Sequence, residues 1–227
     1  MNIWPSIKRV LRDAPVIGAG WARLRERRAR FRSTAEYWDR RYKSGGNSGA
    51  GSYDRLAEFK AKFLNDFVQA RQVASVVEYG CGDGAQLSLA RYPQYIGVDI
   101  SEKAVEMCRA RFNSDDSKQF LWSEAITETP RADLSLSLDV VYHLVEDATF
   151  EAYMRRLFES ALRFVIIYSS NTDQEWDGQH VRHRQFTKWV EANRPDWRFE
   201  SSLKNAYPYD PADPDRTSFA DFYVFAK

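Results

Sequence analysis

Residues 76–85 combine an acidic side chain, Glu78, with three glycines at alternate positions, Gly80, Gly82 and Gly84. Two β-branched residues precede the acid and an Ala/Leu-rich segment follows, so the pattern predicts a strand, a tight turn and a helix. Glycines let a backbone approach a ligand closely, and a helix N-terminus offers unpaired N–H groups. The stretch therefore predicts a ligand site at the end of a strand.

A second carboxylate, Asp99, ends the next predicted strand, nineteen residues after Gly80. A carboxylate at this distance suits a ribose diol, because it accepts hydrogen bonds from both hydroxyl groups. Gly80, Gly82 and Ala85 also fit a dinucleotide fingerprint, but Glu78 would repel a pyrophosphate and attract an amino group. The combination predicts a nucleoside site for a ligand that carries an amino group.

The pattern Glu-x-Gly-x-Gly-x-Gly, with an acid at the end of the following strand, resembles the first motifs of the class I S-adenosylmethionine-dependent methyltransferases. The resemblance covers roughly residues 70–170 and implies an enzyme whose cofactor is S-adenosyl-L-methionine. It also implies the fold class, an α/β Rossmann-like sheet of seven strands that is mostly parallel, with an antiparallel last strand and helices on both faces. The alternation of predicted strands and helices through residues 75–170 itself supports a mostly parallel sheet.

The family's motifs, carried onto this chain, imply a set of cofactor-binding residues at the ends of the first four strands. These are Glu78, Gly80, Cys81, Gly82, Asp99, Ile100, Ser123, Glu124 and Asp139. Glu124 fills, in register, the place of an acid that the family directs at the adenine amino group, although Asp is more usual there.

Asp139 and His143 follow the fourth predicted strand and stand four residues apart. Ligands in open α/β sheets gather at the carboxyl ends of strands, so both residues fall where a substrate is expected. Residues at this spacing can share one side of a helical turn, where His143 would take a proton while Asp139 holds its tautomer. This pair is the predicted catalytic base. The alternatives are that His143 only packs and that Asp139 contacts the methionine moiety of the cofactor.

The polar segment 172–184 follows the fifth predicted strand and contains the other two histidines, His180 and His183. All three histidines thus lie beyond strands four and five, which favours acid–base chemistry. His180 and His183 are candidate substrate residues, with ordinary loop polarity as the alternative. Their spacing alone could indicate a metal, but no second element supplies ligands at a defined spacing, so no metal site is predicted.

Residues 33–72 are predicted to form a helical lid or cap that precedes the methyltransferase core, 73–227. Their central stretch, 45–53, contains four glycines and is flanked by aromatic and charged residues. Such a stretch is either a flexible linker or a mobile lid over the cofactor. In the lid interpretation, Tyr37, Tyr42 and Tyr53 become contact candidates, with Tyr37 and Tyr53 assigned to the substrate.

Residues 1–32 form a basic amphipathic N-terminal extension with a net charge of +7, so the rest of this chain of net charge +1 carries −6. An apolar face that includes Trp4, flanked by arginines, suits the interface of an anionic membrane. The alternative is that this face packs on the domain or on the second subunit of a homodimer. The negative remainder argues against nucleic acid as a partner.

The chain contains no apolar run near the roughly 20 residues that a bilayer-spanning helix needs, and no secretory signal is visible. Its two cysteines, Cys81 and Cys108, are expected to be free thiols in a reducing cytosol. We therefore expect a cytoplasmic protein, located at the inner face of the cytoplasmic membrane if the basic extension binds lipid.

In combination, three further segments, 37–60, 137–147 and 169–190, resemble methyltransferases encoded with bacterial surface-polysaccharide synthesis. That resemblance implies O-methylation of a sugar hydroxyl on a free, nucleotide-linked or lipid-linked glycan. Methyl transfer from a sulfonium needs alignment of the acceptor and removal of its proton, and an alcohol needs a base. The alternatives are an N-methyltransferase of a small metabolite or protein, which would tolerate the loss of His143, and a non-catalytic interaction module with the same fold.

Overall fold

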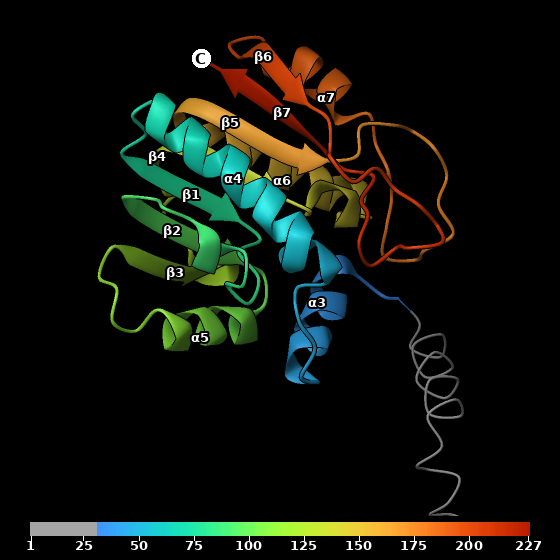
Figure 1. The fold of residues 1–227 in the computed structure, drawn as a ribbon, viewed down its shortest axis with the longest axis horizontal. Helices are drawn as coiled ribbons and strands as arrows, with labels where there is room; N and C mark the ends of the chain where they lie inside the picture. The colour runs from blue at the N-terminus through green and yellow to red at the C-terminus, as the bar shows by residue number, and fades with distance from the viewer. Residues whose placement is uncertain (1–30) are drawn as a thin grey trace, which may run out of the picture. The chain divides into compact units, whose positions relative to one another are not determined.

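The structure of the protein, a computed structural model, describes residues 31–227. The predicted basic extension therefore lies outside the described residues, except for its last two positions. The described part contains a seven-stranded sheet in the order β3-β2-β1-β4-β5-β7-β6 (Figure 1). Its strands are β1 (Ser75–Tyr79), β2 (Gln94–Asp99), β3 (Lys118–Trp122), β4 (Ala132–Leu138), β5 (Ala161–Ser169), β6 (Arg198–Leu203) and β7 (Asp221–Ala226).

Strands β1 to β5 pair in parallel, whereas β7 runs antiparallel to both of its neighbours, β5 and β6. The predicted Rossmann-like, mostly parallel sheet with an antiparallel last strand is confirmed. In this order β1 lies between β2 and β4, so the carboxyl ends of these three strands meet at one edge of the sheet. That edge is where open α/β sheets bind their ligands.

Helices cover both faces of the sheet, as predicted. On one face α4 and α5 pack against the apolar side chains, and on the other α6 and α7 do so (Figure 1). The helices are α3 (Thr34–Lys43), α4 (Asp54–Ala70), α5 (Glu102–Arg111), α6 (Asp147–Glu159) and α7 (Phe186–Asn193). Within residues 31–227, no helix has the length and apolar character that a membrane crossing requires.

The central strands show why the sheet needs two covered faces. Val165, Ile166 and Ile167 follow one another on β5, and all three side chains are fully buried. Consecutive side chains of a strand point to opposite faces, so such a continuous apolar run is stable only between two layers of helix.

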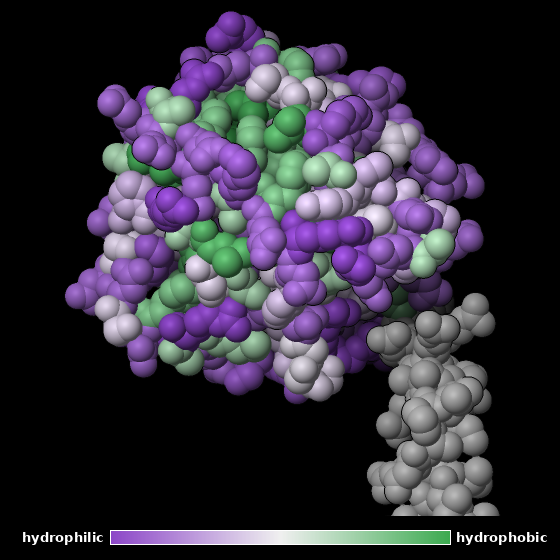
Figure 2. All heavy atoms as spheres, in the orientation of Figure 1, coloured by the Kyte–Doolittle hydropathy of each residue, from purple (hydrophilic) through white to green (hydrophobic). Residues whose placement is uncertain are grey.

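Helix α4 is amphipathic in a way that suits a cover over the sheet. Leu56 and Leu64 are buried, whereas Glu58, Lys62 and Asp66 are exposed. The face of the molecule on which α4 lies is mainly hydrophilic, with apolar side chains visible between the polar ones (Figure 2). Burial of this apolar stripe, rather than intrinsic propensity, supplies most of the stability of such a helix.

Serine side chains fix the start of two helices that border the site. Ser33 accepts a hydrogen bond from the Glu36 N–H at 3.2 Å and begins α3. Ser101 accepts one from the Ala104 N–H at 3.4 Å and begins α5 directly after β2. Each cap satisfies a backbone donor that the helix leaves unpaired, a contribution of about 1 kcal/mol.

The helix predicted immediately after the glycine turn is wrong. Only a single 3-10 turn, Leu87–Leu89, forms between β1 and β2. Ala90, which ends it, is extended, and Pro93 disfavours helical backbone in the residue before it. The turn's N–H groups are therefore not those of a helix N-terminus, and they bond to side chains instead, Gly82 to Asp99 and Asp83 to Ser48.

Candidate active site

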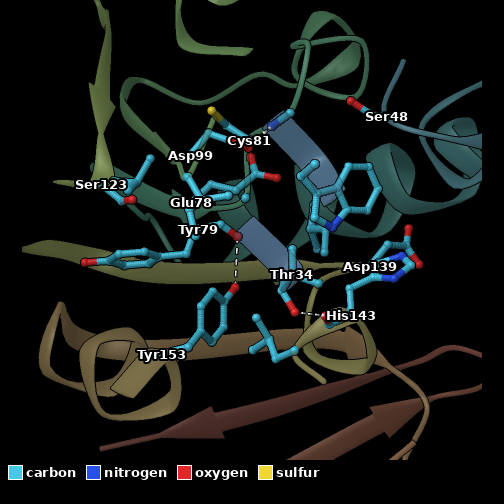
Figure 3. Close-up of a pocket in the computed structure, with 18 of the residues that line it drawn as sticks. Thr34, Ser48, Glu78, Tyr79, Cys81, Asp99, Ser123, Asp139, His143 and Tyr153 are labelled. Atoms are coloured by element: carbon cyan, nitrogen blue, oxygen red, sulfur yellow. Dashed lines mark hydrogen bonds between the residues drawn. The ribbon is translucent and has the colours of Figure 1, made fainter. Parts of the chain in front are cut away.

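A cavity of about 460 Å³ lies at the carboxyl ends of β1, β2 and β4 (Figure 3). Helix α3 contributes Thr34, Trp38 and Tyr42 to its wall, and α6 contributes Tyr153. Eight of the nine expected cofactor residues line it, namely Glu78, Gly80, Cys81, Gly82, Asp99, Ile100, Ser123 and Asp139. The cavity is thus the place where the cofactor motifs of the sequence converge.

The glycine turn is the part of the cavity wall that tolerates no side chain. Gly80, Gly82 and Gly84 have φ angles of 85°, 59° and 76°, all in the left-handed region that L-residues avoid. A Cβ atom on Gly80 would lie 2.4 Å from Val140 Cγ2, and one on Gly82 would lie 2.3 Å from Ser48 Oγ. Glycine at these positions keeps the backbone open to a ligand.

Asp99 is buried at the end of β2 and is held by backbone donors. Its Oδ2 accepts the Gly82 N–H and its Oδ1 accepts the Ser101 N–H, both at 2.9 Å. Burial raises the pKa of Asp99 to about 6, although these N–H groups lower it. A carboxylate oxygen has more than one lone pair, so this fixed group can also accept hydrogen bonds from a diol.

Glu78 is buried at the end of β1, beside the glycine turn. Its Oε2 accepts the Tyr95 hydroxyl at 2.7 Å. Burial raises the pKa of Glu78 to about 7, against the Tyr95 hydrogen bond and the positive charge of Lys60, which lower it. Burial is thus only partly offset by the groups around Glu78. A cationic ligand group that binds beside this carboxylate would stabilise its ionised form.

Gln86 adds a second acceptor to the same part of the cavity. Its Nε2 donates to the Ala57 carbonyl at 3.1 Å, while its buried Oε1 has no hydrogen-bond partner among the described residues. A buried acceptor without a partner costs free energy until a donor reaches it. Together, Gln86 and Glu78 fit a ligand ammonium group, and Asp99 fits a ribose.

Asp139 and His143 both line the cavity, but the structure separates their roles. Asp139 Oδ2 lies 2.5 Å from Lys60 Nζ, and its Oδ1 accepts the Tyr142 hydroxyl at 2.9 Å. His143 Nδ1 lies 2.8 Å from the His180 carbonyl oxygen. A carbonyl can only accept, so Nδ1 carries the proton and Nε2 is the acceptor.

The expectation that Asp139 holds the tautomer of His143 is therefore wrong, because the His180 backbone carbonyl does so. The spacing argument assumed an α-helical turn. Instead Asp139 has a left-handed φ of 59°, and residues Val141–His143 form a 3-10 turn with three residues per turn. Burial lowers the pKa of His143 to about 4, so the ring is neutral near pH 7.

Aromatic rings from α3 and from the segment after β5 meet over His143. Tyr37 stacks on His180 at 4.6 Å between ring centres, and His180 in turn stacks on His143 at 5.5 Å. Trp38 meets His143 edge-on at 5.0 Å. Tyr37 and His180, two of the predicted substrate residues, thus stack next to His143, although neither of them lines the cavity.

The other three predicted site residues lie elsewhere, and none of them lines the cavity. The Tyr53 hydroxyl donates to Asp83 Oδ2 at 2.6 Å. His183 Nδ1 lies 2.6 Å from Ser170 Oγ, in a buried position. Glu124 is exposed, because the 3-10 turn Ser123–Ala125 begins directly at the end of β3. Within the described part of the chain, no group of three or more His, Cys, Asp or Glu side chains could hold a metal ion.

Sequence reasoning missed several residues that line the cavity, above all Lys60 and Gln86. For Lys60 a signal existed, since it stands four residues from Leu56 and four from Leu64, within the apolar stripe of a predicted helix. For Gln86 none existed, because its position depends on the 3-10 turn that replaces the expected helix.

A family model described as "Methyltransferase domain" matches residues 76–163, from β1 into β5. The chain is a methyltransferase. Its cofactor is S-adenosylmethionine, and the cavity residues fit that group, with Asp99 available to the ribose and Glu78 and Gln86 to the amino group. No curated protein sequence matches this chain.

Several solved structures share the fold of this methyltransferase. The methyltransferase domain of bacterial CtHen1 is 20% identical, with a TM-score of 0.59 over 76% of this chain and 100% of that one. Magnesium protoporphyrin IX methyltransferase from Synechocystis PCC 6803, with bound SAM, is 16% identical, with a TM-score of 0.63 over 88% and 99%. The N-methyltransferase NodS from Bradyrhizobium japonicum WM9 is 14% identical, with a TM-score of 0.66 over 86% and 99%. At these identities the likeness shows the fold.

Replacing the β2 carboxylate tests the nucleoside part of the site. We expect Asp99→Asn to weaken binding of S-adenosylhomocysteine by roughly 10- to 100-fold, the loss typical of hydrogen bonds to a charged group. Isothermal titration calorimetry measures it, and His143→Ala, on the other side of the cavity, is the control that keeps wild-type affinity. Equal affinities of Asp99→Asn and wild type would contradict the assignment.

The raised pKa of Glu78 makes cofactor binding depend on pH. A ligand ammonium group favours ionised Glu78, so the affinity for S-adenosylhomocysteine should rise with pH and level off above about pH 7. In Glu78→Gln the rise between about pH 6 and 7.5 should disappear, while the part due to Asp99, below about pH 6, remains. Calorimetry from pH 5 to 8 checks this. The same dependence of affinity on pH in wild type and in Glu78→Gln would contradict it.

Proposed function

We propose that this methyltransferase O-methylates a sugar hydroxyl of a glycan or a glycan precursor, with His143 as the base. The observation that carries the proposal is the state of His143. Its ring lines the cavity, its Nδ1–H is committed to the His180 carbonyl, and its Nε2 is an acceptor. An alcohol acceptor requires such a group, whereas a neutral amine can be methylated before it loses a proton.

The low pKa of His143 is compatible with this role. When bound, S-adenosylmethionine supplies a methyl group on a sulfonium, which is a good leaving group. As the acceptor oxygen forms its new bond to carbon, its proton becomes strongly acidic, so a weakly basic imidazole suffices to take it. The direct methyl transfer is thus base-assisted, and a pKa of about 4 keeps the imidazole neutral and able to accept throughout the neutral range.

Aromatic side chains near His143 support a sugar as the acceptor. Trp176 and Tyr209 are both exposed, and their ring centres lie 5.4 Å apart. Phe219 contacts both rings and also packs against Tyr142, the neighbour of His143. This exposed pair of aromatic rings, connected to His143 through Phe219 and Tyr142, offers the apolar faces on which a sugar can stack while its hydroxyls remain accessible.

The glycine-rich stretch 45–53 is the lid in this proposal. Ser48 N–H donates to Asp83 Oδ2 at 3.0 Å, and Asp83 N–H donates to Ser48 Oγ at 2.9 Å. Together with the Tyr53 hydroxyl on the same carboxylate, these bonds hold the stretch against the glycine turn. A lid held at its tip by a few hydrogen bonds can open for cofactor exchange and exclude water when closed.

Loss of the imidazole tests the chemical role of His143. We expect His143→Asn to lower kcat by roughly 100-fold or more with sugar acceptors, while the affinity for S-adenosylhomocysteine stays at the wild-type value. The wild-type kcat should fall only below about pH 5, since protonation near the pKa of about 4 removes the acceptor. The acceptors assayed are nucleotide-linked sugars, lipid-linked glycans and, for comparison, primary amines.

The same panel separates the proposal from its rivals. Methylation of an amine that survives in His143→Asn would make the protein an N-methyltransferase. Cofactor binding with no acceptor turned over by the wild type would favour an interaction module.

The basic extension 1–32 is proposed to bring the cytoplasmic enzyme to the inner face of the membrane, where lipid-linked glycans are built. Lysines and arginines near an anionic surface contribute about 1 kcal/mol each. We expect deletion of residues 1–32 to abolish co-sedimentation with vesicles that contain anionic lipid, and to leave the affinity for S-adenosylhomocysteine unchanged. Unchanged sedimentation of the truncated protein would contradict the membrane role.

A further inference from the structure

Lys60 is buried in the apolar stripe of α4. It lies between Leu56 and Leu64 at a spacing of four residues, and only 1% of its side chain is exposed. A lysine this deep is costly unless its ammonium group is paired, and even then an apolar residue would often be more stable. The position therefore points to a use for the charge other than packing.

The surroundings of Lys60 are those of the cavity. Its Nζ lies 2.5 Å from Asp139 Oδ2 and 5.3 Å from the centre of the Tyr168 ring. Its charge also lowers the pKa of Glu78. The glycine-rich stretch passes directly over the ion pair, since a Cβ atom on Gly51 would lie 2.7 Å from Asp139 Oδ2. The pair is thus enclosed between α4, the end of β4 and the proposed lid.

This end of the cavity contains three acceptors and one cation. The acceptors are the carboxylates of Glu78 and Asp139 and the unpartnered Oε1 of Gln86. Of the lysines and arginines that line the cavity in the described chain, Lys60 is buried and Arg156 is exposed on α6. A free α-amino acid group presents an ammonium and a carboxylate side by side, and it needs acceptors for one and a cation for the other.

We propose that Lys60 binds the carboxylate of the methionine moiety of the cofactor, and that its ion pair with Asp139 is exchanged for that carboxylate. Glu78 and Gln86 then receive the ammonium group. The exchange keeps Lys60 paired in both states, so the buried charge is never left alone. The proposal concerns the cofactor only and does not depend on which acceptor is methylated.

Three ligands that differ in their amino-acid end test the proposal by calorimetry. They are S-adenosylmethionine, its decarboxylated form, which lacks only the carboxylate, and 5′-methylthioadenosine, which lacks the amino-acid end. We expect Lys60→Met to weaken S-adenosylmethionine by roughly 10- to 100-fold and to leave the other two ligands within about twofold of wild type. Lys62→Met is the matched control, because Lys62 lies on the same helix, is exposed and pairs with Asp66.

Two outcomes would overturn the proposal. If Lys60→Met weakens all three ligands equally, Lys60 serves the shape or the charge balance of the site and does not bind the carboxylate. If wild type binds S-adenosylmethionine and its decarboxylated form equally well, nothing in the cavity recognises the carboxylate. The second comparison needs no variant, so it decides the matter even if Lys60→Met fails to fold.

Asp139→Asn gives an independent check in a protein that keeps Lys60. Removing the competing carboxylate should maintain or increase the wild-type preference for S-adenosylmethionine over its decarboxylated form. If this preference disappears in Asp139→Asn, recognition of the ligand carboxylate depends on the structure that Asp139 maintains. That outcome would overturn the proposal.

Discussion

Three carboxylates, Glu78, Asp99 and Asp139, meet at the ends of three neighbouring strands, with one buried ammonium group, Lys60, among them. This imbalance of charge is the constraint on which the rest of the site depends. Burial raises the pKa of Glu78 and of Asp99, a neighbouring carboxylate adds to each rise, and a ligand that brings positive charge relieves the imbalance. The site is therefore prepared for S-adenosylmethionine, which carries an ammonium and a sulfonium against one carboxylate.

The sheet order produces this meeting of charges, and the glycine turn makes it accessible. Because β1 lies between β2 and β4, the residues that end these strands come together although they are far apart in the chain. Gly82 then links two of the strand ends, since its N–H donates to Asp99 while its left-handed backbone keeps side chains away from the cavity. The fold brings the charges together, and the turn leaves space for the ligand between them.

Much of this arrangement could be predicted from the sequence, because Glu78, the glycines and Asp99 are set by local pattern and strand order. What failed was the argument from helical spacing. It assigned the tautomer of His143 to Asp139, but the backbone at Asp139 is left-handed, the next turn is a 3-10 turn, and the His180 carbonyl accepts from His143 instead. Lys60 interrupts an apolar stripe, which marks it as unusual, but its partner is 79 residues away in the chain and only the fold identifies it. Long-range pairing of this kind has no local signal.

The hydrogen bonds that join Ser48 and Tyr53 to Asp83 have a consequence for the kinetics of the enzyme. In the proposed lid role, this segment detaches from the glycine turn each time a spent cofactor is replaced. The residence time of the product is then governed by how firmly one carboxylate, Asp83, holds the segment rather than by the methyl transfer itself. In such an enzyme, the strength of these hydrogen bonds sets both the turnover rate and the extent of product inhibition. A change that alters one therefore also alters the other.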